Sequence, residues 1–123
     1  MSTWKNRPLA TRFACALRGF ARALGSEQNL KLQLLALTLV LALLGFLHPG
    51  PLWWALVLLS SATVLATELL NTALEQLADA LHPKQSAAIG SAKDCAAAAV
   101  LVACLGALGV ATALGVHLLK GAG

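Results

Sequence analysis

The sequence predicts an all-α membrane protein in which an N-terminal amphipathic surface helix precedes three transmembrane helices. Hydrophobic residues make up 59% of the 123 positions and charged residues only 11%, whereas soluble globular domains carry about 25% charged residues. The apolar segments are also long enough to cross a bilayer, which requires about 20 residues per helix. Residues 1–123 are therefore expected to form a single integral-membrane domain.

The first expected element is a surface helix over residues 8–25. Its large apolar side chains fall within about 60° of one another on a helical wheel: Phe13, Leu17, Phe20 and Leu24. Arg18 and Arg22 face the opposite side, so the helix suits the surface of an anionic bilayer. The segment lacks the apolar core of a removable signal peptide. We expect no nucleic-acid partner, because the rest of the chain is lipid-soluble.

Three transmembrane helices are expected next, over residues 30–48, 52–81 and 91–119. The turn at 48–51 separates the first two spans, because two prolines and a glycine cannot continue a helix. Pro83 interrupts the linker between the second and third spans. Lys31 and Gln33 lie near enough to the start of the first span for their side chains to reach the headgroup layer.

The distribution of Lys and Arg predicts the orientation in the membrane. These residues gather before the first span and in the linker that contains Lys84, whereas the turn at 48–51 has neither type. Beyond the last span only Lys120 is basic. The positive-inside rule therefore places the N-terminus in the cytoplasm and the C-terminus outside.

The second span carries four polar side chains on one face: Glu68, Asn71, Glu75 and Asp79. At about 100° per residue, their spacings of three, four and four place them in a stripe roughly 80° wide. Three of the five carboxylates in the chain lie in this polar stripe. A carboxylate near the middle of a membrane helix costs about 2.5–3.5 kcal/mol on insertion, so its presence indicates a functional site.

Two kinds of chemistry fit the polar stripe. In the first, a buried Glu68 alternates its protonation state and couples to proton or cation transport. In the second, Glu27 and Glu75 ligate a hard cation such as Mg²⁺, which prefers one or two carboxylates plus phosphate oxygens, and Glu68 acts as a general base. The sequence contains no G-x-x-x-x-G-K-[ST] motif, so a phosphotransferase here would have a different architecture from the soluble ones.

Lys93 and Asp94 stand at the expected start of the third span, just after Gly90 and Ser91. The free N–H groups of a helix N-terminus attract phosphate, and the Lys93 ammonium adds a point charge. Alone, this pair would indicate a lysine whose ammonium group extends to the headgroup layer. The aspartate would then only interact favourably with the positive end of the helix dipole. Beside the polar stripe, at the same depth, the pair favours a phosphate site.

The third span has small residues at every fourth position: Ala99, Ala103, Ala107, Ala111 and Gly115. Such a row lets helix backbones approach closely. Packing within one chain and association between subunits both fit the row. We favour association, because three helices give buried carboxylates little protection.

These polar residues resemble those of the prokaryotic diacylglycerol kinase family. The resemblance rests on Glu68-Leu-Leu-Asn71-Thr-Ala-Leu-Glu75 with Asp79, followed by Ala92-Lys93-Asp94. It covers nearly the whole chain, including Glu27 ahead of the first span.

The resemblance implies a homotrimeric enzyme of the bacterial inner membrane, with a cytoplasmic active site, that transfers the γ-phosphate of ATP to the hydroxyl of a membrane lipid. It implies that Glu68 is the general base and that Glu27 and Glu75 hold the Mg²⁺ that bridges the ATP phosphates. The ATP-binding residues that it implies are Glu27, Glu75, Asp79, Lys93 and Asp94. Asn71 completes the polar site.

The resemblance leaves undecaprenol and diacylglycerol open as acceptors. The diacylglycerol kinase branch typically has Glu-Ala-Ala-Phe-Arg where this chain has Glu27-Gln-Asn-Leu-Lys31, and an acidic residue and a histidine in the linker at the positions of Lys84 and Ser86. Three features are more similar to the undecaprenol kinase branch: Asn29, Thr72 and Asp94-Cys-Ala-Ala97. We therefore favour undecaprenol as the expected acceptor.

Overall fold

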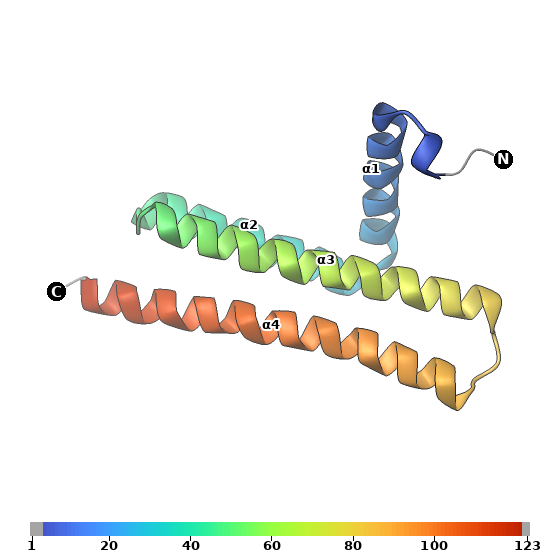
Figure 1. Ribbon diagram of the computed structural model, residues 1–123. Coiled ribbons are helices and arrows are strands. Elements are labelled where there is room, and N and C mark those ends of the chain that lie inside the picture. The colour runs from blue at the N-terminus through green and yellow to red at the C-terminus, as the bar shows by residue number, and fades with distance from the viewer. Residues whose placement is uncertain (1–3, 122–123) are drawn as a thin grey trace.

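The computed structural model describes residues 4–121, and every regular element in this range is helical. A short 3₁₀ turn precedes four α-helices: η1 (Trp4–Asn6), α1 (Leu9–Ser26), α2 (Gln28–Leu47), α3 (Pro51–Leu81) and α4 (Ala87–Gly121). Figure 1 shows α3 and α4 running side by side in opposite directions, with α2 behind α3. The predicted all-α architecture is confirmed, and the ends of α1, α2 and α3 agree with the predicted ones to within two residues.

The helices α2, α3 and α4 are each long and apolar enough to cross a membrane. At 1.5 Å per residue, the 20 residues of α2 span about 30 Å, the hydrocarbon thickness of a bilayer. With 31 and 35 residues, α3 and α4 are longer than this layer. Because α2 and α3 meet at one turn, the surplus length of α3 lies at its C-terminal end. The chain is therefore a multi-pass membrane protein whose polar stripe runs toward the protruding end of α3.

The turn between α2 and α3 is set by its backbone conformation. His48 ends α2 in the left-handed region with φ of 51°, and its N–H donates to the carbonyl of Leu44 at 3.0 Å. Gly50 has φ of 113°, which only glycine adopts without strain. Pro51 opens α3, where its missing N–H has no intrahelical partner to lose. The turn predicted at 48–51 is thus confirmed.

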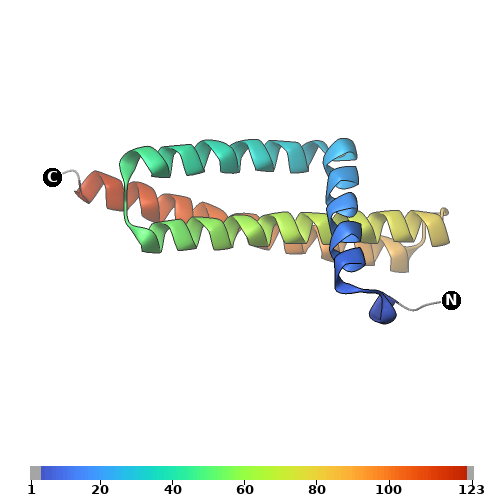
Figure 2. The same cartoon turned by 90° about the horizontal axis from the view of Figure 1, so that it is seen from above.

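Helix α1 lies across the bundle and not along it, as Figures 1 and 2 show. Only Glu27 separates α1 from α2, and the extended backbone of this residue (φ −106°, ψ 111°) produces the change of direction. Part of the apolar face of α1 covers α3 near Thr72. Phe13 and Leu17 nevertheless remain 66% and 58% exposed, which suits a helix that lies in a bilayer surface.

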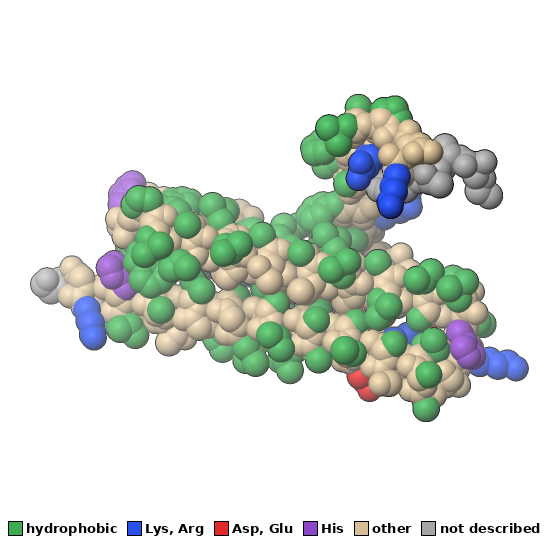
Figure 3. Space-filling view, in the orientation of Figure 1, with side chains coloured by type: hydrophobic (Ala, Val, Ile, Leu, Met, Phe, Trp, Pro, Cys, Tyr) green, Lys and Arg blue, Asp and Glu red, His purple; other side chains and the backbone are tan. Residues whose placement is uncertain are grey.

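The long helices bury few side chains against one another. One cluster, near the 48–50 turn, contains Leu44, Val57 and Leu114. Large apolar side chains cover the outer faces, whereas Lys and Arg gather on α1 and at the ends of the bundle (Figure 3). In a membrane the outer faces contact lipid tails, which are as apolar as the side chains.

Helix α4 begins four residues before its predicted start at Ser91. Ser86 stabilises the earlier start, because its Oγ accepts a hydrogen bond from the N–H of Ile89 at 3.2 Å. The linker therefore shortens to 82–86. The expectation that Lys93 and Asp94 stand at the helix N-terminus is wrong, since both lie in the second turn of α4.

Along the row of small residues in α4, Ala103, Ala107 and Gly115 are half-buried in the described chain, whereas Ala99 and Ala111 are exposed. A Cβ added at Gly115 would meet no heavy atom within 4 Å. Ala107, Ala111 and Gly115 instead line an open groove between α2, α3 and α4. Because α3 and α4 pack against each other in the described chain, packing within one chain and association between subunits both stay predictions for this row.

Candidate functional site

Glu68 is the deepest carboxylate of the polar stripe. Only 5% of its surface is exposed, and its Oε2 accepts a hydrogen bond from Gln33 Nε2 of α2 at 3.3 Å. The expectation that Gln33 reaches for the headgroups is therefore wrong. Its side chain turns inward, because a buried carboxylate without a hydrogen-bond donor is strongly disfavoured.

Asn71 and Glu75 form the next pair along α3. Asn71 Nδ2 donates to Glu75 Oε1 at 3.3 Å, a contact that the spacing of four residues allows because such side chains are neighbours on a helix surface. Asn71 Oδ1 is buried and has no hydrogen-bond partner among residues 4–121. An amide carbonyl and a carboxylate, the oxygen donors that hard cations prefer, therefore lie side by side.

Asp79 marks the outer end of the polar stripe and pairs with Lys93 of α4. The distance from Lys93 Nζ to Asp79 Oδ1 is 2.6 Å. The side chains are 35% exposed for Lys93 and 68% exposed for Asp79, and ion pairs this accessible contribute only about 0–1 kcal/mol to stability. The contact thus holds an ammonium group at the end of the stripe without being essential to the fold.

Glu27 and Asp94 take no part in these contacts. Glu27 is half-buried at the junction of α1 and α2, and Asp94 is exposed on α4. Within residues 4–121, neither side chain makes a hydrogen bond or an ion pair. The described residues also contain no group of three or more His, Cys, Asp or Glu side chains that could hold a metal. One chain therefore offers a cation at most two carboxylates, and the other ligands would be phosphate and water.

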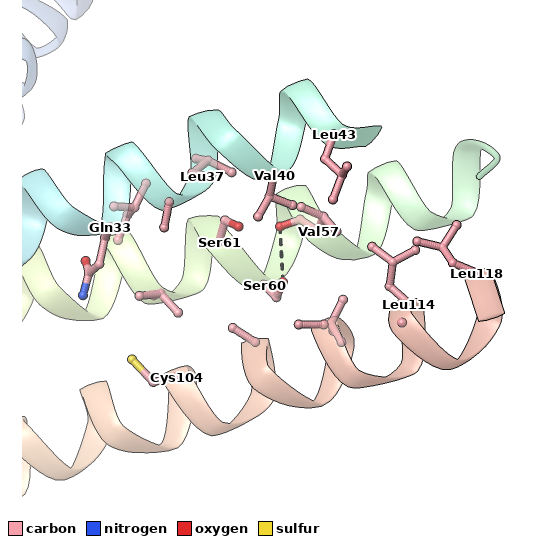
Figure 4. Close-up of a pocket in the computed structure, with 17 residues that line it drawn as sticks. Gln33, Leu37, Val40, Leu43, Val57, Ser60, Ser61, Cys104, Leu114 and Leu118 are labelled. Atoms are coloured by element: carbon pink, nitrogen blue, oxygen red, sulfur yellow. Dashed lines mark hydrogen bonds between the residues drawn. The ribbon is translucent and has the colours of Figure 1, made fainter. Parts of the chain in front are cut away.

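An apolar groove extends from the Gln33–Glu68 contact along the membrane-spanning part of the bundle. It has a volume of about 410 Å³ and lies between α2, α3 and α4. Figure 4 shows Gln33 at one end and Leu118 at the other, with Ser60, Ser61 and Cys104 as polar or polarisable groups between them. The groove is apolar along most of its length and ends beside the amide that contacts Glu68.

A second hollow, of about 850 Å³, lies beneath α1. The α3 residues that line it are Leu69, Thr72, Ala73 and Gln76. Thr72 is only 5% exposed and lies one turn from Glu68. Apolar hollows therefore flank the buried part of the polar stripe on two sides.

A smaller hollow of about 270 Å³ lies under the linker between α3 and α4. Its ionisable lining residues are Asp79, His82, Lys84 and Lys93. Ser86 also lines it, and α4 begins at the next residue. Cationic side chains and the start of a helix here could bind an anionic group.

The polar residue that the sequence interpretation missed is Gln33. Counted from the 48–50 turn, Gln33 lies about 22 Å along α2 and Glu68 about 27 Å along α3, at 1.5 Å per residue. The two side chains are thus within about one turn of the same depth. That count was available from the sequence and makes Gln33 a candidate partner of Glu68, but it does not give the rotation of the two helices that brings the side chains together.

Comparison with known proteins adds to this picture. The family model for prokaryotic diacylglycerol kinase matches residues 14–114. A curated protein from Synechocystis sp. described as "Diacylglycerol kinase" is 32% identical over 109 residues, which cover 87% of this chain and 62% of that protein. The chain thus spans less than two thirds of the length of that relative. No solved structure gives a significant match.

Proposed function

The chain belongs to the prokaryotic diacylglycerol kinase family, and from this we propose that it is an ATP-dependent kinase of a membrane lipid alcohol. The observation that carries the proposal is Glu68, a carboxylate that is 5% exposed on a membrane-spanning helix and accepts a hydrogen bond from an amide N–H. Apolar hollows lie on both sides of this part of α3. A general base in such surroundings suits a hydroxyl that arrives from the bilayer.

In the proposed reaction, the hydroxyl oxygen of the lipid attacks the γ-phosphorus of ATP while Glu68 takes the hydroxyl proton. A lipid O–P bond forms, the bond from the γ-phosphorus to the β,γ-bridging oxygen breaks, and ADP leaves. Phosphoryl transfer relies mainly on positioning and on stabilisation of charge. A site with few reactive groups is therefore sufficient.

We assign Mg²⁺ to Glu75 and Glu27 together with the ATP phosphates. The donor chemistry fits, because Glu75 lies beside the unpartnered carbonyl oxygen of Asn71 and Mg²⁺ prefers oxygen ligands. When bound, Mg²⁺ would neutralise negative charge on the phosphates. We expect Asn71 to keep Glu75 oriented toward the cation.

The remaining polar residues are assigned to the nucleotide. The Lys93 ammonium pairs with Asp79 in the structure without ATP. We propose that, when ATP binds, this ammonium leaves Asp79 and pairs with the ATP phosphates. Asp79 and Asp94 would then accept hydrogen bonds from the nucleotide. Lys84 lines the same hollow as Lys93, so a second ammonium group is available for the phosphates.

We propose undecaprenol as the preferred acceptor, with diacylglycerol as the alternative. The support is the resemblance to the undecaprenol kinase branch at Asn29, Thr72 and residues 94–97. Thr72 is also buried one turn from Glu68 and lines the hollow beneath α1, so a change at this position is close to the reacting group.

We further propose that the enzyme is a homotrimer of the bacterial inner membrane with its N-terminus and active site in the cytoplasm. The basic residues before α2 and in the linker support this orientation. The small residues of α4 that line an open groove support contact with a neighbouring subunit.

Proton or cation transport is less well supported. A transport pathway that uses Glu68 would need further ionisable or polar groups at successive depths. Helix α4 has no ionisable side chain between Asp94 and His117 other than the thiols of Cys95 and Cys104, so it adds no charged partner at the depth of Glu68.

The decisive experiment is a kinase assay on the purified protein in vesicles with Mg²⁺ and ATP labelled at the γ-phosphate. Separate reactions would contain undecaprenol, diacylglycerol or no added alcohol. We expect labelled lipid phosphate with an added alcohol and a higher initial rate for undecaprenol. Labelled product from neither lipid would contradict the kinase proposal, and ion flux without ATP would support transport.

A further inference from the structure

Gln33 contacts the proposed base from another helix. Its Nε2 donates to Glu68 Oε2 at 3.3 Å, and Gln33 belongs to α2 whereas Glu68 belongs to α3. No other hydrogen bond of the Glu68 side chain is found within residues 4–121. The orientation of this carboxylate therefore depends on one amide group.

The second half of the same amide has no partner. Gln33 Oε1 is buried and accepts no hydrogen bond from any described residue. A buried acceptor left unpaired costs about 1–3 kcal/mol, so its retention beside Glu68 calls for a reason. A glutamine amide is both a donor and an acceptor, and a half-turn about its last bond exchanges the two roles.

A general base passes through both protonation states in each turnover. As a carboxylate it only accepts hydrogen bonds, and after it has taken a proton it carries an O–H donor. The Nε2 group serves the first state and Oε1 can serve the second. Lysine could not do this because it only donates, and methionine offers only a weak acceptor.

We propose that Gln33 is a positioning residue for Glu68, whose amide donates to the ionised form and, after a half-turn, accepts from the protonated form. This role rests on the proposed kinase function. Gln33 acts on the reaction through Glu68 and needs no contact with ATP. Its loss should therefore lower kcat while the KM values for ATP and for the lipid stay the same.

The test compares three variants with the wild-type protein in the same vesicles. Gln33→Met keeps the length of the side chain and removes its N–H donor. Gln33→His restores a group that both donates and accepts. Thr38→Val is the matched control on α2, since Thr38 is exposed and its hydroxyl bonds only to the backbone carbonyl of Leu34.

We expect Gln33→Met to lower kcat by at least about tenfold, with both KM values within twofold of wild type. We expect Gln33→His to recover most of this loss and Thr38→Val to match wild type.

Wild-type kcat in Gln33→Met, or a Gln33→His variant no better than Gln33→Met, would overturn the role of Gln33. If Gln33→Met fails to fold, a Gln33→His variant with wild-type KM values and less than a tenth of wild-type kcat would overturn it. Wild-type protein that makes no phosphorylated lipid would overturn the proposed function, and this role with it.

Discussion

Each of the three carboxylates in the polar stripe accepts a hydrogen bond from one side chain, and the three donors come from different helices. Gln33 of α2 serves Glu68, Asn71 of α3 itself serves Glu75, and Lys93 of α4 serves Asp79. Burial decreases along the same series, from a 5% exposed Glu68 to the exposed Asp79. Substitutions at the two ends of the stripe should therefore have different effects.

At Glu68, we expect the change Glu68→Gln to lower kcat by about 100-fold or more, because general bases contribute about 10²–10⁴. The fold should be retained, since glutamine has the shape of glutamate and can still contact Gln33. Initial rates of lipid phosphorylation and a melting curve in detergent would measure both effects. Turnover equal to wild type would remove Glu68 from its assigned role.

At the exposed end, we expect Lys93→Met to raise the KM for ATP by about tenfold or more, because hydrogen bonds to charged groups are worth about 1.5–3 kcal/mol. The matched variant Asp79→Asn removes the same ion pair from the other side. Both changes should lower the free energy of unfolding by less than about 1 kcal/mol. An unchanged KM for ATP in Lys93→Met would separate this lysine from the nucleotide.

At the scale of the element, the start of α4 determines where Lys93 lies. Ser86 caps the helix through the N–H of Ile89, so Lys93 is in the second turn, where it reaches Asp79. The cap in the linker thus sets the position of Lys93 relative to Asp79 at the polar end of α3.

We expect Ser86→Ala to lower the free energy of unfolding by about 1 kcal/mol, the usual loss for a helix N-cap. Amide hydrogen exchange should accelerate at Ile89 and in the rest of the first turn of α4. Ser91→Ala is the control, because Ser91 is exposed and has no side-chain hydrogen bond among the described residues. Equal exchange rates in the two variants would argue against the cap.

At the scale of the whole molecule, the described chain leaves α4 largely uncovered. Leu114 is the only residue of α4 that is buried in this range, and Ala107, Ala111 and Gly115 line an open groove. This arrangement is what a helix would show if its partner belonged to another subunit.

We expect the detergent-solubilised protein to have three times the 12.7 kDa mass of one chain, after correction for bound detergent in light scattering. Ala107→Leu should weaken the trimer, because it fills the groove with a larger side chain. The control is Ala113→Leu, at an exposed position of α4 that does not line the groove. A monomeric wild-type protein would contradict the trimer.

Local sequence features predicted most of the fold. Hydropathy gave the three long helices, the 48–51 turn followed from its prolines and glycine, and the apolar face of α1 followed from its helical period. The start of α4 was misplaced, because Ser86 competes with Gly90 and Ser91 as a helix start and only the contact with Ile89 decides between them. The roles of all the site residues stay predictions: Glu27, Glu68, Asn71, Glu75, Asp79, Lys93 and Asp94.

By itself, the sequence determined that this is a helical membrane protein with a polar stripe on one long helix, because hydrophobicity and the 3.6-residue period are properties of neighbouring residues. Only the tertiary structure decided that Gln33 turns inward to Glu68, that Lys93 reaches Asp79 and that α1 crosses α3 near Thr72. These contacts join residues that are far apart in the chain, and they depend on how the helices are aligned in depth and rotated about their axes. No local pattern encodes that alignment.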